Sequence, residues 1–277
     1  MEKGRLNVRK LIVEVVRISM EDDIFALASQ LAYGLLFALF PFLIFLMTLV
    51  GFSSIKSYDV LQIFERIMPE QVFGLVRGII LEVTEKRNGN LLSLSLIISI
   101  WASMSGFNAI VKGLNMSYRE EERRGFLKVQ LISFIFTIGL VVTIFAITVL
   151  MVFASVNEPI VARWFHNPGI TTFVWDFIKY FILVLTMLFV FSAVYRYTPV
   201  KKHRWSDVIW GGLFTTVGWI VSSFGFSYYI NNFGNYSKIY GSIGAVIVLM
   251  TWLFMGSFIL ILGGEINSAI LNKNIYK

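Results

Sequence analysis

The sequence predicts an all-α, polytopic membrane protein, a bundle of six transmembrane helices with short interfacial and extracellular helices. Hydrophobic residues make up 57% of the 277 residues and charged residues only 15%, which is too apolar for a soluble domain of this length. The apolar segments are long and continuous, whereas the strands of a membrane β-barrel alternate over short segments. Lys and Arg gather at the two ends of the chain and in alternate connections, which predicts that both termini are cytoplasmic.

Composition also excludes several kinds of site. The chain has no cysteine, so disulfides, thiolate metal sites and cysteine nucleophiles are excluded. Its two histidines, His166 and His203, are expected on opposite sides of the membrane, and we expect no metal and no cofactor. The net charge of +7 is expected to hold cytoplasmic loops against anionic lipid, so membrane lipids are expected partners and nucleic acid is not.

The first part of the chain is expected to contain one surface helix, one span and one long connection. Residues 1–23 mix basic and apolar side chains, which predicts a cytoplasmic helix either in the lipid interface or solvated at the base of the bundle. The first span is predicted at 24–51, with a kink at Pro41. Residues 52–90 have helical periodicity but no spanning run, which predicts an extracellular helical connection that either caps a cavity or packs as a loop.

The second predicted span, 91–114, is unusually polar from its middle onward. Ser105, Asn108, Lys112 and Asn115 recur near one face at helical spacing. Polar groups at membrane depth usually meet other helices or water, because exposing them to lipid is costly. The sequence therefore predicts that this face points into the bundle.

Four further apolar segments complete the bundle, and the whole chain, 1–277, is expected to form a single membrane domain. The predicted spans lie at about 131–156, 173–197, 208–230 and 241–267.

The last predicted span carries the candidate site. It is uncharged until Glu265, and a carboxylate at the end of an apolar run must be paired, hydrated or protonated. Glu265 is thus either a proton-carrying or substrate-contacting group, or half of a structural ion pair with Arg196; Lys112 is a second cationic candidate at a similar depth. Asn235 and Tyr236, in the turn before this span, are further candidate cavity residues.

Several ordered motifs resemble one known family. The stretches are QLAYGLLFALFPFLIFLMTLVG, WASMSGFNAIVKGLNMSY with EERRGFLK, RYTPVKKHRWSDVIWGG, and FSYYINNFGNYSKIYGSIGAVIVLMTW with GGEIN. They resemble the YihY/BrkB family of bacterial six-helix inner-membrane proteins over nearly the whole chain. The resemblance implies a multi-pass protein of the bacterial cytoplasmic membrane that is transporter-like, with an unsettled substrate. Family members also carry older ribonuclease and virulence-factor labels.

Three functions are weighed. The first is a transporter-like protein with a polar cavity among its helices and a small molecule or ion as substrate. The second, its alternative, is a membrane scaffold or partner-binding protein. The third, a ribonuclease, would need a metal site or an acid–base pair on the cytoplasmic side. The inner loops offer acids and one histidine, but basic residues flank the acids, as on a solvated surface, so we expect no enzyme activity.

Overall fold

The computed structural model describes residues 8–51, 61–62, 65, 73–74, 77–78, 89–162, 168–233 and 242–271. Within them the chain forms seven long or medium helices and no strand. Their bounds are α1 Val8–Glu21, α2 Ile24–Gly51, α5 Gly89–Ser117, α6 Phe126–Ala162, α7 Pro168–Tyr197, α8 Trp205–Phe233 and α10 Ser242–Leu271. Each of the six expected spans falls on one of these helices, and most of the 52–90 connection lies outside the described residues.

Membrane-spanning length and hydropathy are found in four of the described helices. The candidate spans are Phe126–Ile147, Val174–Tyr197, Trp205–Ile230 and Val246–Leu271. The count becomes five if α1 and α2, which meet at a sharp bend, are taken together as one span. The molecule is therefore a polytopic helical membrane protein, and the six-span count stays a prediction.

The bend between α1 and α2 is built by two consecutive aspartates. The two helices meet at 66°. Asp23 has a positive φ of 45°, a conformation that aspartate tolerates better than most residues. Its carboxylate also accepts a hydrogen bond from the Ala26 N–H at 3.4 Å and so caps the start of α2. The sequence thus stops α1 and starts α2 within two residues.

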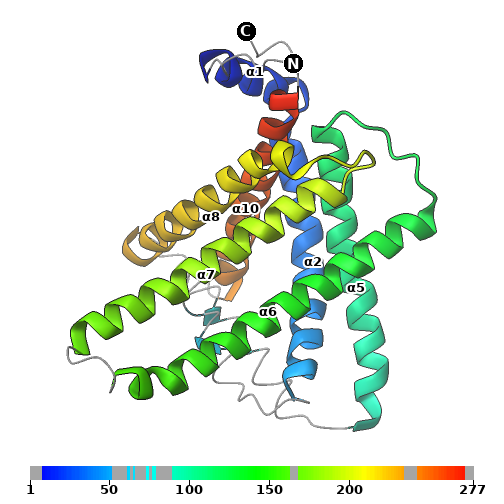
Figure 1. Cartoon of the computed structure of the whole chain (residues 1–277). Helices are drawn as coiled ribbons and strands as arrows, with labels where there is room; N and C mark the ends of the chain where they lie inside the picture. The colour runs from blue at the N-terminus through cyan, green and yellow to red at the C-terminus, as the bar shows by residue number, and fades with distance from the viewer. Residues whose placement is uncertain are drawn as a thin grey trace.

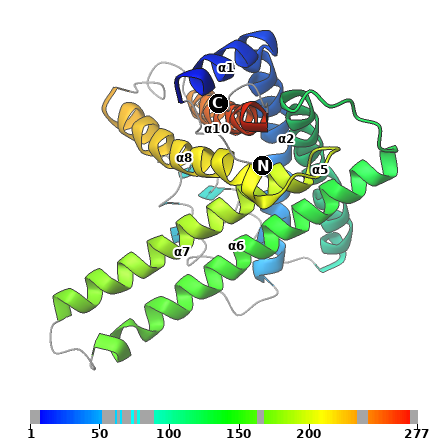
Figure 2. The same cartoon turned by 45° about the horizontal axis from the view of Figure 1, so that its top comes forward.

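Helix α10 occupies the middle of the bundle (Figures 1 and 2). It packs against α1, α2, α5 and α8, while α2 also packs along α5, α7 along α8, and α6 along α5 and α7. Helices α8 and α10 approach very closely, because a Cβ added at Gly263 would overlap Thr215 and Tyr195, and one added at Gly211 would overlap Gly263 and Asn267. Such small residues allow helix association where lipid gives no hydrophobic driving force.

One end of the bundle holds α1, the 118–125 and 198–204 loops and the last turns of α10, and we call it the predicted cytoplasmic end (Figure 1). The main buried apolar cluster lies in this half of the molecule. Its members are Ile24, Leu27, Leu31, Phe107, Ile110, Leu114, Val194, Tyr195, Val208, Leu260 and Ile261. Toward the opposite end, α6 and α7 run side by side away from α2 and α5 (Figures 1 and 2).

Candidate functional site

Glu265 is completely enclosed in the predicted cytoplasmic half of α10. Its relative exposure is 0%, and neither carboxylate oxygen has a hydrogen-bond partner among the described residues. Buried carboxylates normally find a partner, because an isolated charge in an apolar interior is very costly. This side chain is therefore the main feature that the structure leaves to be explained.

The end of α5 forms the wall against Glu265. A Cβ added at Gly264 would lie 3.1 Å from Leu114 and 3.3 Å from the Cβ of Ser117, and one added at Gly113 would lie 2.8 Å from Ile261. Ser117 is itself 0% exposed, and its hydroxyl lies near enough to Glu265 to interact with the carboxylate, although the geometry between them falls short of a hydrogen bond. Glycines on both helices therefore bring an unpaired hydroxyl beside an unpaired carboxylate.

Arg196 is not the ion-pair partner of Glu265, which corrects one of the two sequence interpretations. Its guanidinium lies over two aromatic rings, 5.1 Å from the centroid of Tyr197 and 4.9 Å from that of Trp205. Aromatic faces attract a guanidinium, and these rings lie on the outer side of the α7–α8 junction. Arg196 therefore turns away from the interior helix α10.

The charges that do act on Glu265 come from the α1–α2 bend and the end of α5. They are Asp22 and Arg119. Arg119 is already engaged, since it donates to Glu21 at 2.6 Å and to Asp22 at 3.4 Å. No ion pair between Glu265 and any described residue is present.

The polar face predicted on α5 does not point inward as a whole. Asn115 is 3% exposed and Asn108 is half-buried, whereas Ser105 and Lys112 are exposed. At 100° per residue the two asparagines lie about 20° apart, but Ser105 and Lys112 lie roughly 40° to 80° further round the helix. That rotation carries the latter two out of the helix interface, and the prediction is wrong for them.

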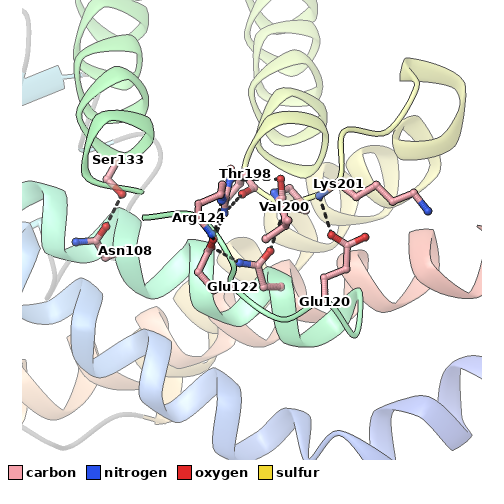
Figure 3. A network of polar contacts seen from close by, with 10 residues as sticks. Asn108, Glu120, Glu122, Arg124, Ser133, Thr198, Val200 and Lys201 are labelled. Carbon is pink, nitrogen blue, oxygen red and sulfur yellow. Dashed lines mark hydrogen bonds and ion pairs between the residues drawn. The ribbon is translucent and has the colours of Figure 1, made fainter. Parts of the chain in front are cut away.

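The inward pair serves to join helices and loops (Figure 3). Asn108 accepts a hydrogen bond from Ser133 and donates to Gln130 at 3.3 Å, which fastens α5 to α6. Asn115 donates to Glu122 at 2.8 Å and accepts from the Val200 N–H at 3.0 Å, which fastens α5 to both neighbouring loops.

Glu122 and Arg124 extend this junction into what we call the clamp, formed by Asn115, Glu122, Arg124 and the backbone of 198–200 (Figure 3). Arg124 pairs with Glu122 and donates to the Thr198 carbonyl at 3.0 Å. Only 8% of its side chain is exposed, unlike that of Arg123 at 81%. Sequence reasoning treated this loop as a solvated charged surface, and nothing in its local pattern separates the two arginines.

A second buried network braces α7, α8 and α10. The Tyr195 hydroxyl lies 2.6 Å from the Thr215 hydroxyl and donates to the Leu260 carbonyl at 2.7 Å. The Asn267 side chain accepts from the Gly211 N–H at 2.7 Å and donates to the Val208 carbonyl at 3.2 Å. Sequence analysis did not single out these residues, although a tyrosine or asparagine within an apolar span is a signal for such a bond.

The candidate cavity residues predicted from the sequence differ in where they lie. Asn235 and Tyr236 lie outside the described residues. Of the remaining candidates, the structure brings Asn108 and Asn115 into helix contacts and buries Glu265 beside Ser117, and it separates Arg196, Lys112 and Ser105 from that carboxylate.

The acids considered for nuclease chemistry hold structural positions. Glu120 accepts from the Lys201 N–H at 2.7 Å, and Asp207 accepts from the Arg204 N–H at 3.2 Å at the start of α8. The His203 ring stacks on Tyr118 at 4.6 Å, and burial lowers its pKa. Within the described residues, no group of three acids, histidines or cysteines could hold a metal ion.

The helices and the enclosed carboxylate define a polytopic α-helical membrane protein with a polar site inside its bundle. Comparison of the chain with protein families then specifies the family. The family model described as "Virulence factor BrkB" matches residues 15–276, and the chain belongs to this family.

One named relative is similar to the chain over most of its length. "Putative ribonuclease-like protein YfkH" of Bacillus subtilis is 41% identical over 246 residues, covering 89% of each chain. A UPF0761 membrane protein of Methylibium petroleiphilum is 23% identical over 89% of this chain and 58% of its own length. A UPF0761 membrane protein of Vibrio atlanticus is 25% identical over 88% of this chain and 76% of its own. No solved structure matches the chain significantly.

Proposed function

We propose that the protein is a transporter-like protein of the bacterial inner membrane and that its present conformation is closed toward the cytoplasm. The observation that carries this proposal is Glu265, a carboxylate with 0% exposure and no described hydrogen-bond partner. A carboxylate that only braced the fold would be expected to have a partner, because an unpaired buried charge costs several kcal/mol. A carboxylate that gains its partner only in another conformation, or only from a bound ligand, is expected to be unpaired in the present conformation.

The distribution of packing supports a conformation closed at one end. The buried cluster, the clamp and the ion pairs of Arg119 all lie at the predicted cytoplasmic end. At the opposite end α6 and α7 run away from α2 and α5 (Figure 2). An alternating-access protein in its outward-facing state has this asymmetry, and a polar cavity would then approach Glu265 from the diverging end.

The proposal takes six helices as membrane spans and both termini as cytoplasmic. Besides the four candidate spans, α2 and α5 contain 28 and 29 residues, or about 42 Å and about 44 Å at 1.5 Å per residue, which exceeds a hydrocarbon core of ~30 Å. Helix α1 meets α2 at 66° and exposes Ile12, Val13, Val16 and Met20 on one side. An exposed apolar side on a bent-off helix suits a position in the lipid interface.

The proposal does not include ribonuclease activity. Its support is that Glu120, Glu122 and Asp207 are used to hold backbone groups and Arg124, so they are not collected into an acid–base or metal-binding group. An assay of purified protein, free of contaminating nucleases, tests this directly, and RNA cleavage that is lost in an E120Q/D207N double variant would contradict it.

Alternating access can be tested with a single reporter, because the natural chain has no cysteine. Ser117→Cys places a thiol beside Glu265, and its reaction with a membrane-impermeant reagent is measured from outside in intact cells and from inside in inverted vesicles. Arg119→Ala removes the pairs with Glu21 and Asp22 and should speed the inside reaction while slowing the outside one. The control, Arg123→Ala, removes a side chain that is 81% exposed and should change neither rate.

The reciprocal change is what separates a transporter from a scaffold. If the protein exchanges between an inward-open and an outward-open state, a substitution that favours one state must raise access to the thiol from one side and lower it from the other. A static scaffold whose loop has been loosened would react faster from inside with no decrease from outside. That result, or a thiol that never reacts from outside, would rule out the proposed function.

A further inference from the structure

We propose that Glu265 and Ser117 form a binding site for one monovalent cation at the C-terminal end of α5. The role of this site in transport depends on the function proposed above, whereas cation binding itself does not. The shared chemistry is a single positive charge held by oxygen atoms, and its sources are a sodium ion, a potassium ion or a proton.

The first argument is that the two residues offer unused oxygen ligands in an enclosed place. Both Glu265 oxygens and the Ser117 hydroxyl are buried and have no hydrogen-bond partner among the described residues. Buried polar atoms in native proteins are nearly always satisfied by protein, water or an ion. Carboxylate and hydroxyl oxygens are the ligands that hard cations prefer.

The second argument is an excess of negative charge around Glu265. Three carboxylates, on Glu21, Asp22 and Glu265, share the Arg119 guanidinium, which is bound to the first two. Arg17 is divided between Glu21 and Glu14 and adds no charge at Glu265. One phenol, that of Tyr118 directly after the end of α5, also interacts with Glu265. Among the described side chains, no further cation pairs with Glu265, so its charge is left for a bound cation to balance.

The third argument is the end of α5 itself. The helix closes with hydrogen bonds from Arg119 N–H to the Met116 carbonyl and from Glu120 N–H to the Asn115 carbonyl, both at the turn that follows Ser117. A helix C-terminus carries a partial negative charge and favours cations. Because these bonds occupy the Met116 and Asn115 carbonyls, the helix end contributes its partial charge at this point and not those two carbonyl oxygens as ligands. Here the helix end and the carboxylate meet at one point.

The site suits a single charge and not a divalent metal. Asp22 is bound to Arg119 and Glu21 to both Arg119 and Arg17, so Glu265 is the carboxylate left free at this point of the described structure. A Ca²⁺ site normally uses several carboxylates. No group of three acids or histidines able to hold a metal exists within the described residues.

Thermal unfolding of the full-length protein in detergent tests the site without requiring a substrate. Sodium or potassium chloride replaces N-methylglucamine chloride at constant ionic strength in one series, and pH is varied at constant salt in a second. A cation that binds only the native state raises Tm with its concentration. We expect Tm to rise by several degrees in one of the two series. It should rise with sodium or potassium concentration if the bound ion is a metal, and with falling pH if it is a proton.

Three variants assign the effect to the site. Glu265→Gln should remove the dependence, and Ser117→Ala should weaken it while the carboxylate remains. The control, Asp176→Asn, changes a 51% exposed carboxylate at the far end of α7 and should leave the dependence as it is. A wild type whose Tm responds in neither series, or a Glu265→Gln variant that responds like the wild type, would overturn the proposal.

A chemical probe keeps the test valid if Glu265→Gln fails to fold. Dicyclohexylcarbodiimide modifies protonated carboxyl groups in apolar surroundings, and mass spectrometry of the wild type locates the modified residue. If the bound ion is a metal, sodium or potassium should slow the labelling of Glu265; if it is a proton, only raised pH should slow it. A labelling rate that changes with none of the three contradicts the site. If cation dependence is absent while the Ser117→Cys rates still change reciprocally, the cation site is wrong and the transporter proposal survives.

Discussion

Asp23 and Arg119 are the non-glycine residues with positive φ in the described chain, at 45° and 55°, and the ion pairs of Arg119 bring the two turns together. Arg119 ends α5 in the position that glycine usually takes, a conformation that costs an L-residue roughly 1 kcal/mol. Its side chain, in this position, bonds to Glu21 and Asp22. The strain therefore marks the place where the α1–α2 bend is fastened to the end of α5, directly beside Glu265.

Glu122 allows a prediction about pH at the residue scale. Hydrogen bonds from Arg124 are the main cause that holds the pKa of Glu122 below its ordinary value of 4.5. Because the folded pKa is the lower one, the carboxylate contributes stability above pH 4.5 and loses that contribution as the pH falls through the folded pKa. Glu122→Gln should therefore lower Tm at neutral pH, and the difference from wild type should shrink on acidification below pH 4.5.

The matched control for this prediction is the neighbouring acid. Glu121 has a side chain that is 83% exposed, against 32% for Glu122, so Glu121→Gln should change Tm little at any pH. If the Tm difference between Glu122→Gln and the wild type stays constant through the acid range, the clamp does not depend on this carboxylate.

At the scale of helices, the close crossing of α8 and α10 depends on Gly263. An added Cβ there would overlap the hydroxyls of Thr215 and Tyr195, which are bonded to each other. Gly263→Ala should therefore destabilise the protein by about 1–3 kcal/mol through overpacking. Gly139 in α6 is the control, because nothing lies within 4 Å of its added Cβ and alanine is the better helix former.

Thermal unfolding of both variants in the same detergent measures the difference. Gly139→Ala should be neutral or slightly stabilising, by at most about 1 kcal/mol. Equal stability of Gly263→Ala and the wild type would mean that α8 and α10 can separate at little cost, which contradicts the close packing described for these helices.

At the scale of the whole molecule, the prediction concerns orientation. If both termini are cytoplasmic and six helices cross the membrane, the first turn of α8 faces the cytoplasm and the connection before α10 faces outward. Ser206→Cys should then react with an impermeant thiol reagent in inverted vesicles, and Ser237→Cys in intact cells. The cysteine-free chain gives no background, and reaction of both positions from the same side would refute the six-span topology.

The class of protein follows from properties that are local in the chain. Hydropathy over about 20 residues and the absence of strand-like alternation are enough to predict membrane helices, because lipid demands that each span satisfy its own backbone hydrogen bonds. The expected first span, 24–51, has the same bounds as α2, and the family resemblance is confirmed by a model that matches residues 15–276. Gly263 and Gly264, directly before Glu265, provide the close helix packing that small residues allow in lipid.

The partners of each polar group depend on helix rotation and on the neighbours that tertiary packing supplies. A rotation of roughly 40° to 60° separates half-buried Asn108 and buried Asn115 from exposed Lys112, and sequence spacing alone could not say where the helix interface ends. Arg196 and Glu265 were expected at similar depths, yet one lies against Trp205 and the other near Ser117. Sequence alone thus determined that a carboxylate would end an apolar helix in the membrane. Only the tertiary structure decided that this carboxylate is enclosed without a partner, because burial and pairing are set by side chains distant in the chain.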